Sequence, residues 1–292
     1  MSKHDKKIAV VTGGAGFIGS HLCERLVAEG YRVISLDNYF TGSRDNHVAG
    51  VEYREGHTKD IAKLIPEDPD IIYHLGEYSR VLTSFVDVAT VWNLNVAGTF
   101  GVLEFCKHKK ARLVYAGSST KFGEFDDVED GENQSPYAYF KASNTRLVNN
   151  YGLWFGLDYA ITYFYNVYGP RERSGTYGTL IQIFYKKFKN NEPLTVVSPG
   201  TQQRNFTYVK DTVDGIILVG EKGSGDGYCI ASPESYSVLE VAEMFGGRLK
   251  MTPAKPGDRK HSKQNVTKIT ELGWSPKQSL ENYIRALKED IS

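Results

Sequence analysis

Short apolar runs alternate with helical patterns through the first half of the chain. The apolar runs, each four to six residues long, are typical of strands and lie at 8–12, 31–36, 51–54, 71–74, 112–116 and 159–163. Between them, apolar side chains recur at helical spacing, notably over 18–29, 84–107 and 136–155. Buried strands joined by helices are typical of a parallel sheet covered on both faces. The pattern therefore predicts an α/β fold with a doubly wound parallel sheet.

The pattern changes after residue 165. Apolar segments become irregular and are interrupted by Gly-Pro, Ser-Pro-Gly and Pro-Gly-Asp breaks at 169–170, 198–200 and 256–258. We therefore expect residues 1–165 to form the sheet domain and 166–292 to form mainly a smaller α/β substrate domain. The stretch 205–223 is strand-like and then strongly helical, and we expect it to return to the first domain. An amphipathic helix is expected at 280–291.

Composition and charge limit the partners. The 292 residues carry 35 Lys plus Arg and 35 Asp plus Glu, so no overall field favours nucleic acid or an anionic membrane. Cys23, Cys106 and Cys229 lack metal-ligand spacing, and we interpret them as packing residues in a reducing compartment. No apolar stretch approaches the roughly 18 residues of a membrane span, and no apolar signal segment precedes the first strand. We expect a soluble cytoplasmic protein without a metal site. Because the net charge is zero, any anion must be bound by a local group of residues.

One candidate anion site follows the first apolar run. The segment VVTGGAGFIGSHL (10–22) places four glycines between a predicted strand and a predicted helix. Glycines let the backbone approach a pyrophosphate, and the free N–H groups at the start of a helix bind its negative charge. The context of strand, turn and helix predicts a Rossmann dinucleotide site. We expect its contacts from Gly13, Gly16, Phe17, Ile18 and Gly19.

An acidic residue marks the end of the second predicted strand. Asp37 follows Gly13 by 24 positions, and a carboxylate there accepts hydrogen bonds from the adenosine ribose and repels a 2′-phosphate. The sequence therefore favours NAD over NADP, although a solvated loop aspartate is the alternative. Arg44 is interpreted as a surface charge. We expect further cofactor contacts from Asn38 and from Leu75, which follows the fourth strand.

The segment SPYAYFKAS (135–143) contains a candidate proton-transfer pair. Tyr137 and Lys141 are four positions apart and share one face of the predicted helix. An ammonium one turn away stabilises a tyrosine phenolate and so makes the phenol a usable base near neutral pH. Ser118, just past the strand in RLVYAGSSTKFG (112–123), offers a third hydroxyl at a strand end. The alternative is an aromatic cluster that only packs, which is the role we expect for Tyr139.

Motifs in a fixed order extend over almost the whole chain. They are TGGAGFIG, DNYFTG, HLGEYSRV, NLNVAGT, AGSSTKFG, YAYFK, FYNVYGPRE, QQRNFTYVKD, PGD and LGWSP. Together they resemble the extended short-chain dehydrogenase/reductase family, specifically its NAD-dependent nucleotide-sugar epimerases and dehydratases of the UDP-glucose 4-epimerase type. The resemblance implies that Tyr137 is the general base, Lys141 its partner and a cofactor contact, and Ser118 the catalytic hydroxyl. It also places Asn95, in NLNVAGT, near NAD.

The same resemblance implies a nucleotide-diphospho-sugar substrate. The expected substrate contacts are Ser119, Asn166, Arg204, Lys255 and Arg259. An arginine suits a diphosphate because its guanidinium binds two oxygens at once. Lys255 stands where many epimerases have an arginine, and we expect Arg259 to compensate. A homodimer is implied as well, through a four-helix bundle formed by the helices near 84–107 and 136–155.

The family reactions differ after a shared first step at the C4 hydroxyl. A 4,6-dehydratase adds acidic residues after the catalytic hydroxyl, and a UDP-glucuronate decarboxylase usually has a glutamate at the position of Thr120. This chain has Ser119, Thr120 and Lys121 there, which favours C4 epimerisation over both alternatives. Glu77 stands where the family commonly has a small residue. It has two interpretations: an acid that reaches the active site, or a glutamate that is on the surface or in an ion pair. His57 replaces the aspartate that contacts adenine. A cofactor-binding regulatory protein without turnover is the second alternative.

Overall fold

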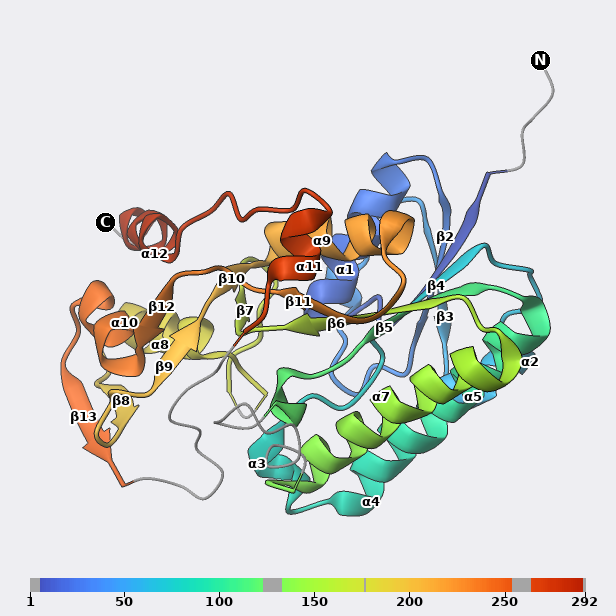
Figure 1. Ribbon diagram of the computed structural model, residues 1–292. Helices are drawn as coiled ribbons and strands as arrows, with labels where there is room; N and C mark the ends of the chain where they lie inside the picture. The colour runs from blue at the N-terminus through green and yellow to red at the C-terminus, as the bar shows by residue number, and fades with distance from the viewer. Residues whose placement is uncertain (1–5, 123–132, 176, 254–263, 291–292) are drawn as a thin grey trace.

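The computed structural model describes residues 6–122, 133–175, 177–253 and 264–290. Its centre is a seven-stranded sheet with the order β11-β6-β5-β4-β1-β2-β3, in which every neighbouring pair is parallel (Figure 1). The predicted doubly wound parallel sheet is therefore confirmed. The strands are β1 (Ile8–Thr12), β2 (Arg32–Asp37), β3 (Val51–Glu55), β4 (Ile71–His74), β5 (Arg112–Ala116), β6 (Tyr159–Phe164) and β11 (Gly225–Ile230).

Helices cover both faces of the sheet (Figure 1). One face carries α1 (Phe17–Ala28), α9 (Val209–Lys222) and α11 (Thr267–Glu271), and the other carries α2 (Ile61–Leu64), α5 (Gly98–Lys109) and α7 (Pro136–Phe155). Successive side chains of β1 point to opposite faces. Val11 accordingly lies in one apolar cluster with Leu22 of α1, and Val10 lies in another with Val102 of α5. The near-continuous apolar runs of the sequence follow from this burial on two sides.

The region predicted as one helix over 84–107 is divided in the structure. It contains α3 (Val81–Ser84), α4 (Val88–Val91), a wider-turn segment (Trp92–Ala97) and then α5. The interruption arises at Asp87, whose side chain accepts a hydrogen bond from the Thr90 N–H and so caps a new helix start. Short helical turns also lie at Arg44–Asn46, Thr58–Asp60 and Ser119–Lys121.

The seventh strand, β11, was not predicted from the sequence. Its segment GDGYCI begins with two glycines that have positive φ and is irregularly paired before Tyr228, so it lacks a typical strand pattern. It nevertheless pairs in parallel with β6. The helix before it, α9, lies within the expected returning stretch 205–223 and packs against α1, β5 and β6. The sheet is thus completed by residues that lie beyond 165.

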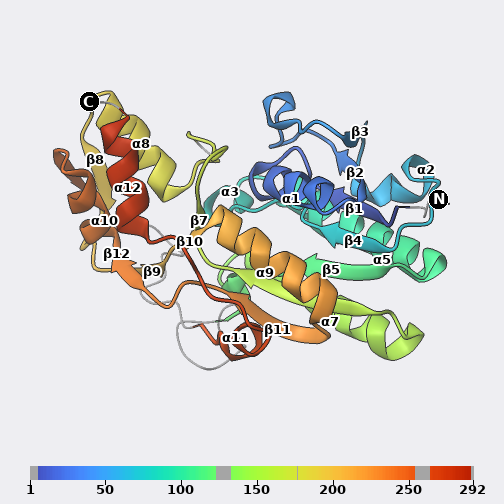
Figure 2. The same cartoon turned by 90° about the horizontal axis from the view of Figure 1, so that it is seen from above.

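A smaller lobe lies beside the sheet (Figure 2). Its apolar cluster joins large side chains such as Phe184, Phe245 and Ile284 from three helices. The sequence expected a C-terminal helix over 280–291, and the structure has one over Leu280–Glu289. The elements of this lobe and its connection are β7 (Val167–Tyr168), α8 (Leu180–Lys189), β8 (Leu194–Val197), β9 (Gln203–Asn205), β10 (Thr207–Tyr208), β12 (Ser235–Ser237), α10 (Val238–Phe245), β13 (Leu249–Thr252) and α12 (Leu280–Glu289).

Across the described ranges, no helix combines the length and apolar character required to cross a membrane. The three cysteines, Cys23, Cys106 and Cys229, are buried and form no disulfide. Within the same ranges, no group of three His, Cys, Asp or Glu side chains is arranged to hold a metal ion.

Candidate functional site

The glycine-rich turn brings the first strand, the first helix and the end of β4 into close contact. Gly13 has φ of 74°, and a Cβ there would lie 2.9 Å from the Cα of Gly76. A Cβ at Gly19 would lie 2.1 Å from the Gly13 carbonyl oxygen. Gly16 caps α1 without a side-chain hydrogen bond, so its first N–H groups face the turn uncapped by a side chain. The turn therefore offers backbone donors and requires glycine at two positions.

Asp37 connects the second strand to this turn. Its Oδ2 accepts a hydrogen bond from the Ala15 N–H at 3.0 Å and its Oδ1 accepts one from the Tyr39 N–H at 2.8 Å. Burial raises the pKa of Asp37, and the two backbone donors oppose that rise. Arg44 instead pairs with Glu55 on the surface. The buried carboxylate and the open turn fit the ribose and the pyrophosphate of an adenosine diphosphate.

The candidate proton-transfer residues lie at the start of α7. Ser135 accepts a hydrogen bond from the Ala138 N–H and Pro136 occupies the first turn, which fixes where the helix begins. Tyr137 is buried and its hydroxyl donates to Ser118 Oγ at 3.2 Å. Tyr139 is 49% exposed and lies outside this contact. The structure therefore brings Ser118 and Tyr137 together across 19 positions of sequence.

One cleft of about 500 Å³ joins these parts. It extends from the glycine turn past Ser118 and Tyr137 to the connection between the sheet and the smaller lobe. Twelve of the residues expected from the sequence line it: Gly13, Gly16, Phe17, Ile18, Gly19, Asp37, Asn38, Leu75, Ser118, Tyr137, Lys141 and Asn166. A cleft of this size, with a glycine turn at one end and a hydroxyl pair at the other, lies in the usual range of small-molecule and cofactor sites.

Lys141 lies one turn after Tyr137 and is buried. Its ammonium forms an ion pair with Glu77 and donates to the Tyr115 hydroxyl at 3.1 Å and to the Ala116 carbonyl. Both side chains of the Lys141–Glu77 pair are only 4% exposed. Burial lowers the pKa of Lys141, and the charge of Glu77 opposes that change. Of the two sequence interpretations of Glu77, the structure has an ion-paired residue, but at the cleft and not on the surface.

Other expected residues lie away from the cleft lining. Asn95 is fully buried behind it, where its side chain accepts from the Tyr78 N–H at 2.7 Å and donates to the Tyr78 carbonyl at 3.1 Å. There the amide of Asn95 supports the Tyr78 backbone, and its proximity to the cofactor stays a prediction. Ser119 follows the lining residue Ser118 in a short turn. Arg204, on β9, donates to the Gln203 carbonyl at 2.8 Å.

Two expected substrate contacts, Lys255 and Arg259, lie outside the described residues. His57 stands at the start of a short turn, where its Nδ1 accepts from the Lys59 N–H at 3.0 Å and its Nε2 lies 3.1 Å from Asn93 Nδ2. It does not line the cleft. The structure thus gives His57 a local capping role.

Sequence reasoning missed several lining residues of the cleft. Arg80 donates to the Tyr177 carbonyl, and Arg173 donates to the Thr41 carbonyl at 2.6 Å, so these arginines connect separate loops that line the cleft. Phe40 contacts the Tyr177 ring with centroids 5.9 Å apart. All of them lie outside regular strands and helices. The periodic patterns used to predict the fold therefore could not single them out.

Known proteins resemble this chain in sequence and in fold. The sequence pattern of the NAD dependent epimerase/dehydratase family matches residues 9–231. UDP-glucuronic acid decarboxylase 5 of Arabidopsis thaliana is 32% identical over 97% of this chain and 88% of its own length. UDP-glucose 4-epimerase of Thermotoga maritima, solved with UDP-glucose, has a TM-score of 0.89 and 26% identity, covering 98% of this chain and 100% of its own.

A third relative was solved with the cofactor. DesIV of Streptomyces venezuelae, a dTDP-glucose 4,6-dehydratase with NAD and TYD bound, has a TM-score of 0.85 and 26% identity over 96% of each chain. The similar proteins therefore include a decarboxylase, an epimerase and a dehydratase. These three activities act on nucleotide sugars. The curated relatives of 30–32% identity are UDP-glucuronic acid decarboxylases, so sequence similarity supports decarboxylation more than C4 epimerisation.

Proposed function

This chain belongs to the NAD-dependent epimerase/dehydratase family, and we propose that it epimerises a nucleotide-diphospho-sugar at C4 through a transient 4-keto sugar. The observation that carries the proposal is the buried contact of Tyr137 with Ser118, one helical turn from Lys141, beside the glycine turn. The geometry supports a base, a hydroxyl relay and a cation at one end of the cofactor cleft.

The chain's own residues perform the proton transfers. Tyr137 as phenolate takes the proton of the C4 hydroxyl, and Ser118 holds that hydroxyl and the phenol in one hydrogen-bonded line. The Lys141 ammonium stabilises the phenolate electrostatically. Bound NAD supplies the hydride acceptor and donor at C4. When the keto sugar has rotated so that its opposite face is toward the cofactor, Tyr137 returns the proton and the opposite C4 configuration results.

The residues after Ser118 favour this outcome over dehydration. Thr120 Oγ1 lies 2.8 Å from Ser118 Oγ, and Lys121 forms an ion pair with Asp226 at 3.1 Å. Neither position supplies a carboxylate to remove the C5 proton or protonate the C6 hydroxyl. A dehydratase needs both functions in addition to the oxidation at C4.

A decarboxylase is the second candidate, because UDP-glucuronic acid decarboxylases are 32% identical to this chain. A 4-keto sugar with a carboxylate on C5 is a β-keto acid. Its C5–C6 bond breaks with loss of CO2, the electron pair moves into the C4 carbonyl as an enolate, and C5 then takes a proton. This step needs no base for the C5 proton, but Thr120 stands where such enzymes usually have a glutamate.

A substrate panel separates these reactions. The purified protein is incubated with UDP-, GDP-, dTDP- and CDP-sugars, UDP-glucuronate included, in deuterated water, and the products are identified by NMR. We expect a C4 epimer of unchanged mass with no deuterium on carbon. Loss of water with deuterium at C5 would identify a dehydratase, and a pentose product with CO2 would identify a decarboxylase. Binding of NAD and sugar without turnover would identify a regulatory protein.

We also propose a homodimer formed by α5 and α7. These helices pack side by side on the same face of the sheet (Figure 1). They expose large apolar side chains, and the exposed fractions are 52% for Phe100, 82% for Leu153 and 60% for Trp154. An exposed apolar surface on two neighbouring helices is typical of an interface. Two copies would bury it as a four-helix bundle.

The double variant Phe100→Asp/Leu153→Asp is expected to dissociate the dimer. Each aspartate would place a charge in an apolar interface, and loss of interface anchors commonly raises the dissociation constant at least about 30-fold. Light scattering after size exclusion measures the mass. Leu249→Asp, on β13 and 43% exposed, is the matched control and should leave the mass unchanged. A wild-type protein that is monomeric at all concentrations contradicts the proposal.

A further inference from the structure

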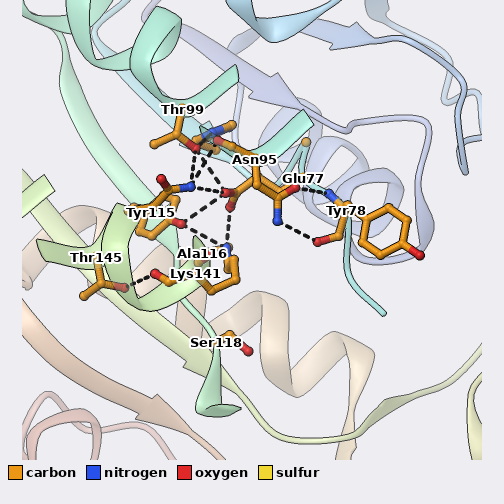
Figure 3. Close-up of polar contacts among 12 residues, drawn as sticks. Glu77, Tyr78, Asn95, Thr99, Tyr115, Ala116, Ser118, Lys141 and Thr145 are labelled. Atoms are coloured by element: carbon orange, nitrogen blue, oxygen red, sulfur yellow. Dashed lines mark hydrogen bonds and ion pairs between the residues drawn. The ribbon is translucent and has the colours of Figure 1, made fainter. Parts of the chain in front are cut away.

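Glu77 is the acceptor at the centre of a buried network between the sheet and α7 (Figure 3). Besides Lys141, its carboxylate accepts hydrogen bonds from the Tyr115 hydroxyl at 3.1 Å, the Thr99 hydroxyl at 3.0 Å and Asn144 Nδ2 at 2.9 Å. A carboxylate has about four lone-pair positions. Three of its four donors share Oε1, and Lys141 occupies Oε2.

The Lys141 ammonium is satisfied. It has three N–H bonds and no acceptor, and its acceptors are Glu77, the Tyr115 hydroxyl and the Ala116 carbonyl. Because all three N–H bonds have protein partners, the position of the ammonium is set by the protein. Its effect on neighbouring groups is then exerted mainly through its charge.

A chain of neutral groups connects this pair to the end of β1. The Gly76 N–H donates to Thr12 Oγ1 at 3.0 Å, and Thr12 lies 2.7 Å from His74 Nδ1. His74 Nε2 lies 3.0 Å from Thr99 Oγ1, which donates to Glu77. Burial lowers the pKa of His74 to about 4, so the ring is neutral at physiological pH. A neutral ring with its proton on Nε2 satisfies every one of these contacts and adds no second cation.

The titratable side chains that face Lys141 come from two strands and its own helix. Glu77 and His74 approach from the end of β4, Tyr115 from β5 and Tyr137 from its own helix. His74 and Tyr115 are neutral, because burial lowers the pKa of the first and raises that of the second. Thr99 of α5 and Asn144 of α7 are uncharged. Glu77 is therefore the compensating charge of Lys141 among the described residues.

We propose that Glu77 is a positioning residue that holds the Lys141 ammonium charged and in place behind Tyr137. A buried ammonium without a counter-charge favours its neutral form, and neutral Lys141 would no longer stabilise a phenolate. The inference rests on the proposed proton transfer by Tyr137 for its catalytic meaning. The glutamate at this position would thus allow the cation to persist where both side chains are only 4% exposed.

The titration of Lys141 tests the proposal directly. Wild-type protein and Glu77→Gln are labelled with ¹³Cε-lysine, and the Lys141 signal, assigned by its absence in Lys141→Met, is followed by NMR against pH. We expect Lys141 to lose its proton at lower pH in Glu77→Gln than in the wild type. Thr99→Val removes a neutral donor from the same carboxylate and should shift the titration far less. An equal shift in both variants, or none in Glu77→Gln, would overturn the proposal.

Activity supplies a second readout if the substrate panel gives turnover. Protonated Lys141 exists below its pKa, so lowering that pKa moves the alkaline loss of kcat/KM to lower pH. We expect Glu77→Gln to lose about tenfold more activity relative to wild type at pH 9 than at pH 6. An equal loss at both pH values would indicate a merely structural role and would sink the proposal.

The NMR shift does not depend on turnover. A shifted Lys141 without any turnover would contradict the proposed function and leave the role of Glu77 standing. If Glu77→Gln is too unstable to titrate, Glu77→Asp withdraws the carboxylate by one methylene and should shift Lys141 in the same direction. An unchanged titration in that folded variant would overturn the proposal.

Discussion

Tyr137→Phe is expected to lower kcat about 10²- to 10⁴-fold on the nucleotide sugar that the protein converts, the range that general acid–base catalysis supplies. Phenylalanine keeps the ring that packs at the start of α7 and removes only the hydroxyl that donates to Ser118. NAD and the sugar should therefore bind with little change in affinity. Single-turnover kinetics with the sugar separates the lost chemical step from binding.

Tyr139→Phe is the matched control for this experiment. It removes a phenol two positions away on the same helix, from a side chain that is 49% exposed and does not line the cleft. Its kcat should equal that of the wild type. A Tyr137→Phe variant that converts substrate at the wild-type rate would show that another group takes the proton.

Lys141→Met is expected to lower the free energy of unfolding by about 3–5 kcal/mol, the usual cost of removing one partner of a buried ion pair. Methionine fills a similar volume, so the loss comes mainly from the Glu77 carboxylate, which is 4% exposed and loses its cation. Urea denaturation followed by circular dichroism measures the change. Lys63→Met, which removes the exposed pair of Lys63 with Asp60, should cost at most about 1 kcal/mol.

The double variant Glu77→Gln/Lys141→Met separates lost charge compensation from lost packing. With both charges removed, no uncompensated ion remains, so most of the stability lost in Lys141→Met should return. Catalysis should not return, because the cation beside Tyr137 is absent. If the double variant loses as much free energy of unfolding as the two single variants lose together, the two side chains are not energetically coupled.

Local features of the site could be predicted from the sequence. The close approach of Gly19 to Gly13 lies within one short segment, and Tyr137 and Lys141 depend on one turn of a single helix. Spacing alone specifies such arrangements. Six strands were likewise predicted, because each is a compact apolar run.

Features that depend on topology could not be predicted. Glu77 and Lys141 are 64 positions apart, and their contact exists only because β4, β5 and α7 are neighbours in space. The contacts of Asn95 depend on the fold in the same way, because its amide holds the backbone of Tyr78, 17 positions away. Strand β11 escaped prediction because its glycines lack the side chains on which strand patterns depend.

The late position of β11 in the chain affects how the protein is synthesised. β6 ends at residue 164 and its outer neighbour β11 ends at residue 230. At roughly 5–20 residues per second, a ribosome needs about 3 to 13 s to add the intervening 66 residues. Throughout that interval the edge of β6 presents unpaired backbone groups to other nascent chains. Aggregation of this protein during synthesis is therefore expected to begin with intermolecular strand pairing at β6.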